Sequence, residues 1–109
     1  MEFDSYQIKA RETALYPNLG SNIIYPTLGL VGEAGEVAEK VKKVLRDNDG
    51  KFDMESKEAI KKELGDVLWY LSNLCTEFNF SLNDVACLNL EKLKLRSSRG
   101  KISGSGDNR

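Results

Sequence analysis

The chain has 109 residues, of which 40% are hydrophobic, and its formal net charge is −1. A chain of this length forms one domain with a modest core, so we expect several copies to associate and bury further surface. The charge provides no basic field for nucleic acid, the apolar runs are too short to cross a membrane, and the N-terminus has no signal-peptide pattern, so we expect a cytoplasmic protein.

Apolar residues recur with the periodicity of helices along the whole chain, which predicts an all-α fold. Four helices are expected, over residues 2–16, 27–46, 54–79 and 81–98. The first helix ends before Pro17, and a loop rich in Asn, Gly and Ser leads to Pro26. Ser81 followed by Asp84 is an N-cap signal for the fourth helix.

The second and third predicted helices each carry one apolar stripe, and we expect the two stripes to face each other. The stripes comprise Leu30, Ala34, Val37, Ala38, Val41, Val44 and Leu45 in the second helix, and Ile60, Leu64, Val67, Leu68, Leu71, Leu74, Cys75 and Phe78 in the third. The connection over residues 47–51 contains the turn signal Asp49-Gly50 and is short, which favours antiparallel packing.

An acidic pattern occurs once in each of these two helices: Glu33 with Glu36, and Glu63 with Asp66. Both pairs lie on the same flank of their stripes, so antiparallel packing brings four carboxylates together. Converging carboxylates repel unless a cation neutralises them, and an all-oxygen set suits Mg²⁺ or Mn²⁺. The chain has no histidine, which removes imidazole ligands and the commonest general base. The alternative is that these acids are ordinary solvated helix surface.

Two further side chains are expected beside the acids. Tyr70 follows Asp66 by one helical turn, and Lys40 follows Glu36 in the same way. An aromatic ring and a cation at these positions suit a base and a phosphate.

A polar stripe is expected on the fourth helix, where Asn89, Lys92 and Arg96 are spaced i, i+3 and i+7 beside an apolar face. Lysine and arginine there could reach over the acids and bind phosphate oxygens, and asparagine could bind an ester or sugar oxygen. The alternative is a solvated surface with snorkelling side chains.

Glycines at positions 29, 32 and 35 interrupt the second predicted helix, where each costs about 1 kcal/mol relative to alanine. Gly65 occupies the same angular position in the third helix as Gly35. We therefore expect close neighbours behind both helices, which a second subunit could supply. For Gly29, an irregular start of the helix is the alternative.

These motifs resemble those of the MazG-like all-α nucleoside triphosphate pyrophosphohydrolases. The resemblance rests on the two acidic patterns, on the segment Asn89-Leu90-Glu91-Lys92-Leu93 and on Arg96, and it covers residues 27–96. Residues 30–39 (LVGEAGEVAE) and 63–68 (ELGDVL) are especially similar to the small single-domain branch that includes dCTP pyrophosphatases. The resemblance implies a helical domain over residues 1–98, a four-helix bundle-like fold in a homodimer or homotetramer, and Mg²⁺-dependent hydrolysis of nucleoside triphosphates to monophosphate and pyrophosphate.

The resemblance also implies roles for individual residues. It makes Glu33, Glu36, Glu63 and Asp66 the catalytic Mg²⁺ ligands, Asn89 and Lys92 contacts to the nucleotide, and Arg96 a phosphate contact. Many relatives carry an additional acid immediately before the first motif glutamate, as a candidate base for the attacking water. This chain has Gly32 there, as the dCTP pyrophosphatase-like branch does, which leaves Glu36, Glu63 or a metal-bound hydroxide for that role.

Residues 99–109 are rich in Gly and Ser and basic, which predicts a flexible tail. The alternative is a loop that closes over a bound triphosphate. The leading functional hypothesis is an enzyme that removes unwanted or excess dNTPs. A helical interaction module and a nucleotide sensor without turnover are the competing hypotheses.

Overall fold

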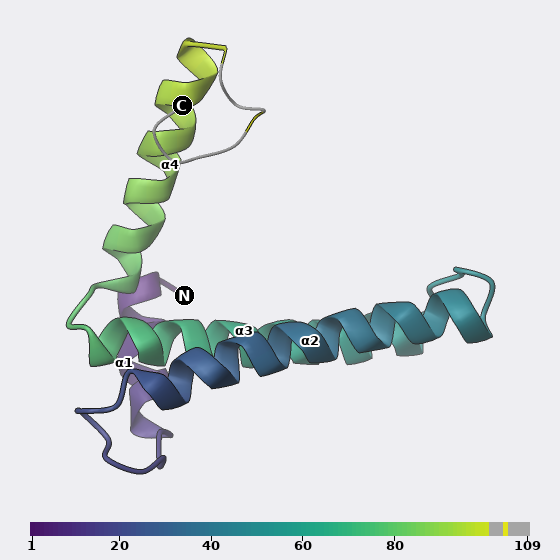
Figure 1. Ribbon diagram of the computed structural model, residues 1–109, viewed down its shortest axis with the longest axis horizontal. Coiled ribbons are helices and arrows are strands. Elements are labelled where there is room, and N and C mark those ends of the chain that lie inside the picture. The colour runs from purple at the N-terminus through teal and green to yellow at the C-terminus, as the bar shows by residue number, and fades with distance from the viewer. Residues whose placement is uncertain (101–103, 105–109) are drawn as a thin grey trace.

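The computed structural model describes residues 1–100 and residue 104. It contains the helices α1 (Phe3–Glu12), α2 (Ile24–Asp47), α3 (Met54–Glu77) and α4 (Leu82–Ser98) (Figure 1). The part of the chain that the structure describes contains no strand, which confirms the all-α prediction. Most of the predicted tail, residues 101–103 and 105–109, lies outside the described residues.

Helices α2 and α3 form a long antiparallel pair, as predicted (Figure 1). The turn between them reverses the chain through Asp49 and Gly50, whose φ angles of 52° and 72° lie in the left-handed region. The N–H groups of Asn48 (3.0 Å) and Gly50 (3.1 Å) both donate to the carbonyl of Val44, which closes the end of α2. Asp53 then caps α3 by accepting from the N–H of Ser56 (2.8 Å).

Helix α2 begins at Ile24, three residues earlier than the sequence predicts. The side chain of Asn22 accepts a hydrogen bond from the N–H of Tyr25 (3.0 Å), so it satisfies one of the unpaired donors of the first turn. Pro26 was expected to precede the helix, but it lies within this first turn, where its missing N–H costs nothing.

Helix α1 ends at Glu12 instead of Tyr16 because residues beyond it are held by a buried carboxylate, that of Glu77 at the end of α3. The Tyr16 hydroxyl (2.6 Å) and Arg11 (2.8 Å) donate to one oxygen of Glu77. The backbone N–H groups of Gly20 (3.0 Å) and Asn22 (2.8 Å) donate to the same carboxylate. This network ties the whole α1–α2 loop to the end of α3.

The ionised form of Glu77 is strongly favoured in the folded state. Burial by itself raises the pKa of this carboxyl, but hydrogen bonds from Asn22, Tyr16, Gly20 and Arg11 outweigh burial and lower its pKa to about 2. The fold therefore depends on the charged, hydrogen-bonded carboxylate of Glu77, although the sequence pattern alone predicts that this residue lies on the helix surface.

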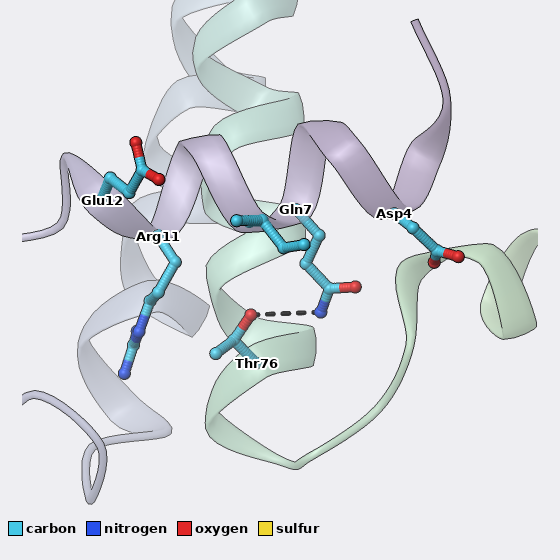
Figure 2. A pocket seen from close by; sticks show the side chains of 6 residues that line it. Asp4, Gln7, Arg11, Glu12 and Thr76 are labelled. Carbon is cyan, nitrogen blue, oxygen red and sulfur yellow. Dashed lines mark hydrogen bonds between the residues drawn. The ribbon is translucent and has the colours of Figure 1, made fainter.

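A second polar anchor, Gln7 of α1, fixes the turn between α3 and α4. Its Nε2 donates to the Thr76 hydroxyl (3.1 Å) and to the carbonyl of Phe80 (2.9 Å), and its Oε1 accepts from the N–H of Leu82 (2.9 Å). Figure 2 shows Gln7 pointing from α1 toward Thr76, in a cavity of about 660 Å³. The bonds to Phe80 and Leu82 hold the start of α4 against α1, and the bond to Thr76 ties α1 to the end of α3.

Helix α4 begins at the predicted N-cap, where the Ser81 hydroxyl accepts from the N–H of Asp84 (3.1 Å). From there α4 projects away from the α2–α3 pair (Figure 1). Among the described residues, α4 contacts α1 and α3 but not α2. The four helices of one chain therefore do not close into a bundle.

The predicted apolar stripes are only partly covered within one chain. Leu45, Leu64 and Phe78 are 61%, 53% and 44% exposed, although the sequence places them in the core. Among the described residues, α4 projects away from the helix pair instead of packing along it (Figure 1). None of the described helices is both long and apolar enough to span a membrane.

Candidate metal centre

Three of the four predicted acids converge between α2 and α3. Glu33 of α2 and Glu63 and Asp66 of α3 each place a carboxylate oxygen within 4.8 Å of the other two. Glu33 and Glu63 are half-buried and Asp66 is exposed. The antiparallel pairing of the helices brings this acidic cluster together from residues that lie about 30 positions apart in the sequence.

The electrostatics of the acidic cluster favour a cation. Partial burial raises the pKa of Glu33, and the carboxylates of Glu63, Asp66 and Glu36 raise it further. The ionised cluster therefore carries a repulsion that a divalent ion would relieve. The side chain of Lys40 relieves part of it, because its Nζ lies 3.6 Å from Oε1 of Glu63.

The donor set fits a small hard ion. Oxygen ligands of Mg²⁺ lie at about 2.1 Å from the metal, so opposite ligands in its octahedron are about 4.2 Å apart. The oxygens of the acidic cluster already lie within 4.8 Å of one another, so a small side-chain adjustment suffices. Carboxylates without thiolate or imidazole are the ligands that Mg²⁺ and Mn²⁺ accept readily.

Glu36, the fourth predicted acid, lies one helical turn beyond Glu33 and is exposed. Its charge contributes to the raised pKa of Glu33, so it lies within electrostatic reach of the cluster. The group of oxygens within 4.8 Å nevertheless comprises only the other three acids. A role for Glu36 as a ligand or base stays a prediction.

Tyr70 packs against Gly29 of α2, and its pKa is raised by burial and further by the charges of Glu33 and Asp66, which lie within electrostatic reach. A Cβ atom at Gly29 would overlap the Tyr70 ring, so the glycine is required for this contact. Helix α2 is regular through Gly29, which rules out an irregular helix start as the reason for this glycine. By contrast, Cβ atoms at Gly32, Gly35 and Gly65 would meet open space within the described chain, so the close neighbours expected behind the helices are not supplied by this chain.

The polar stripe of α4 does not reach the acids within one chain. Asn89 is exposed, Lys92 is half-buried and Arg96 is buried. All three lie on the helix that projects away from the α2–α3 pair (Figure 1). The helix that carries the polar stripe therefore does not contact α2, which carries Glu33.

Aromatic residues near the centre escaped the sequence reasoning. Tyr25 stacks on Tyr16 with ring centroids 5.0 Å apart and lies 6.4 Å from the Tyr70 ring. From α1, Tyr6 approaches Asp66, and burial together with the Asp66 charge raises the pKa of Tyr6. The sequence could have indicated the position of Tyr25, because Tyr25 precedes Gly29 by four residues and both therefore lie on one face of α2.

Comparison with known proteins agrees with this architecture. The family model for the MazG nucleotide pyrophosphohydrolase domain matches residues 26–100. The chain is also 49% identical over 114 aligned positions to "Gene 37 protein" of Mycobacterium phage L5, with all of both chains covered. No solved structure matches the chain. The matched segment contains both acidic patterns and the polar stripe of α4, and the chain belongs to the MazG nucleotide pyrophosphohydrolase family.

Proposed function

We propose that this protein hydrolyses nucleoside triphosphates, dNTPs in particular, to the monophosphate and pyrophosphate in a Mg²⁺-dependent reaction. The observation that carries the proposal is the convergence of Glu33, Glu63 and Asp66 between two helices of a MazG-family chain. These residues would hold Mg²⁺ (or Mn²⁺ as a substitute). Bound to them, the ion would neutralise phosphate oxygens and the charge that develops as the bond between the α- and β-phosphates breaks.

The residues around the acidic cluster have complementary tasks in this proposal. Glu36 is exposed one turn from Glu33, so side-chain rotation can add its carboxylate to the ligand set or direct it at the attacking water. Lys40 faces Glu63 and is 36% exposed at its side chain. Once an ion neutralises Glu63, the Lys40 ammonium is available for a phosphate of the substrate.

We further propose that the active unit is a homodimer or homotetramer in which α4 of one copy serves the acids of another. Asn89, Lys92 and Arg96 would then contact the nucleotide across the interface. Support comes from the position of α4 away from α2 and from the exposed apolar side chains of the helix pair, such as Leu64. Large exposed apolar surface is typical of a protein–protein interface.

Pyrophosphate release tests the proposed reaction. Each natural dNTP is incubated with Mg²⁺ and wild-type protein, the Glu63→Gln variant, or the Glu58→Gln variant as a control for charge on the exposed surface of α3. We expect release by the wild type and the control, and a loss of about 100-fold or more for Glu63→Gln, because the ion loses a charged ligand. Mg²⁺-dependent binding of a dNTP analogue without pyrophosphate release would instead indicate a nucleotide sensor, and neither binding nor release would indicate an interaction module.

Subunit complementation tests the shared site. Lys92→Ala and Glu63→Gln proteins, each impaired alone, are mixed, unfolded and refolded together. If α4 serves a neighbouring copy in a dimer, half of the randomly paired dimers carry one intact site, and about one quarter of wild-type activity returns. Activity no higher than the sum of the separate variants would contradict the shared site.

A further inference from the structure

Three lysines of α2 follow its acidic pattern, and they differ in their ion-pair partners. Lys42 (2.9 Å) and Lys43 (4.0 Å) pair with Glu39 of the same helix. Lys40 instead pairs across to α3, where its Nζ lies 3.6 Å from Oε1 of Glu63. Glu63 belongs to the acidic cluster, so the lysine ammonium occupies the place of a counter-ion beside a candidate metal ligand.

The surroundings of Lys40 strengthen this contact. Its side chain is 36% exposed, against 62% for Lys42 and 55% for Lys43, and that of Glu63 is 19% exposed. Partial burial of both partners reduces the screening of their attraction by solvent. Lys40 also follows Glu36 by four residues, so both lie on one face of α2. The charge of Lys40 therefore acts on the acidic cluster.

The contact between Lys40 and Glu63 is nevertheless loose. A charge-assisted hydrogen bond between an ammonium and a carboxylate is about 2.8 Å long. The 3.6 Å contact exceeds that length. Lysine carries its charge at the end of a flexible aliphatic stem, without the fixed fork of arginine. The ammonium is therefore held by charge, and it can leave Glu63 without the loss of a direct hydrogen bond.

A divalent ion at the acidic cluster would be repelled by this ammonium. A Mg²⁺ ion lies about 2.1 Å from a ligand oxygen, so an ion bound to Oε1 of Glu63 would be within about 6 Å of the Lys40 ammonium where it now lies. At that separation, the repulsion between a divalent and a monovalent cation corresponds to about tenfold in an equilibrium constant, even with the dielectric constant of water. Movement of the lysine away from the ion relieves part of this repulsion.

We propose that Lys40 is a built-in competitor of the metal: it neutralises the acidic cluster in the free protein and yields Glu63 to the divalent ion when a triphosphate offers its ammonium a new partner. This inference rests on the proposed function and concerns how metal and substrate depend on each other. The ion alone binds against the charge of Lys40, whereas the ion and a triphosphate together relieve it. Each of the two ligands therefore favours the binding of the other.

A purely structural role for the ion pair makes the opposite prediction. If Lys40 held Glu63 in position for the ion, loss of the lysine charge would weaken metal binding. If Lys40 competes with the ion, the same loss strengthens metal binding. The sign of the change in metal affinity therefore distinguishes the two roles.

Two titrations test the inference: Mn²⁺ alone, followed by electron paramagnetic resonance of the free ion, and tripolyphosphate in excess Mg²⁺, followed by calorimetry. The proteins are the wild type, Lys40→Met, Lys40→Arg and Lys43→Met. Methionine keeps an unbranched stem without the charge, and arginine keeps the charge. Lys43→Met is a matched control because it removes the same charge from the same helix, but from a lysine that pairs with Glu39.

We expect Lys40→Met to bind Mn²⁺ about three- to tenfold more tightly than the wild type, because the competing charge is gone. The same variant should bind tripolyphosphate about tenfold more weakly, because a charged contact to phosphate is lost. Lys40→Arg should not tighten Mn²⁺ binding, and Lys43→Met should leave both affinities within about twofold of the wild type.

Several results would overturn the inference. Weaker or unchanged Mn²⁺ binding by Lys40→Met would mean that the lysine does not compete with the ion, and unchanged tripolyphosphate binding would mean that its charge does not pass to a phosphate. Tighter Mn²⁺ binding by Lys40→Arg, or an equal gain in Lys43→Met, would show that the effect does not come from this ammonium. Absence of saturable Mn²⁺ binding by the wild type would instead overturn the proposed function, and the inference with it.

Discussion

Replacement of the buried Glu77 by glutamine should destabilise the chain in a pH-dependent manner. The variant keeps the shape of the side chain but removes the charge that pairs with Arg11 (2.8 Å) and accepts from Tyr16. The Glu77 side chain has no exposed surface, so solvent screens these interactions poorly.

The magnitude follows from the pKa of Glu77. Folding lowers this pKa from 4.5 to about 2. At 1.36 kcal/mol per pH unit, the difference corresponds to about 3 kcal/mol of stability at neutral pH. A carboxyl whose pKa is lowered by folding contributes fully above pH 4.5 and loses its contribution as the pH falls toward 2. At pH 3 only about 1 kcal/mol should remain.

Urea unfolding at pH 7 and pH 3 measures this effect, with the fluorescence of Trp69 as the probe. This indole donates to the Thr13 hydroxyl (2.8 Å), so its signal reports on the contact between α1 and α3. We expect Glu77→Gln to lose about 3 kcal/mol at pH 7 and roughly 2 kcal/mol less at pH 3. Titration of the acidic cluster has the opposite sign, but it is common to both proteins and cancels in the difference.

Glu58→Gln, on the exposed surface of α3, is the matched control and should change stability little at either pH. If Glu77→Gln lost less than about 0.5 kcal/mol at pH 7, or lost the same amount at both pH values, the ionised Glu77 would not hold the α1–α2 loop.

Three further predictions concern positions with separate roles. Gly29→Ala should destabilise the protein by about 1 to 3 kcal/mol in thermal unfolding, because the added methyl group displaces the Tyr70 ring; an unchanged melting temperature would contradict the close contact. Gln7→Ala should cost about 1 to 3 kcal/mol, since it leaves the N–H of Leu82 without its acceptor, and hydrogen exchange at that amide should rise; unchanged protection would refute the anchor. Glu33→Gln should stabilise the metal-free protein at pH 7 by less than about 1 kcal/mol, because repulsion within the acidic cluster falls, while Mg²⁺ should no longer raise its melting temperature. A metal-free Glu33→Gln protein less stable than the wild type would count against that repulsion.

The helix pair and the acidic cluster were predictable because both depend on periodicity. The stripes of α2 and α3 fix which faces meet, and the short turn at Asp49-Gly50 fixes the antiparallel direction. The equal placement of Glu33 and Glu63 beside those stripes then determines that the acids converge.

Other features depend on contacts between distant segments, which periodicity does not encode. Glu77 ends a helix, where an acid normally faces solvent, and its four donors come from Arg11 of α1 and from three residues of the folded α1–α2 loop. The start of α4 is held by the bonds of Gln7 to Phe80 and Leu82, which lie 73 and 75 residues away in the chain. Leu64, which the sequence places on a covered stripe, is likewise exposed in the folded chain.

Titration of the protein with Mn²⁺, followed by electron paramagnetic resonance of the free ion, tests most directly whether α2 and α3 form one metal site. Glu33→Gln changes one helix and Asp66→Asn changes the other, and each should weaken the same saturable binding by about tenfold or more, while Glu58→Gln should bind as the wild type does. Wild-type binding that survives either substitution unchanged would contradict a site shared by the two helices.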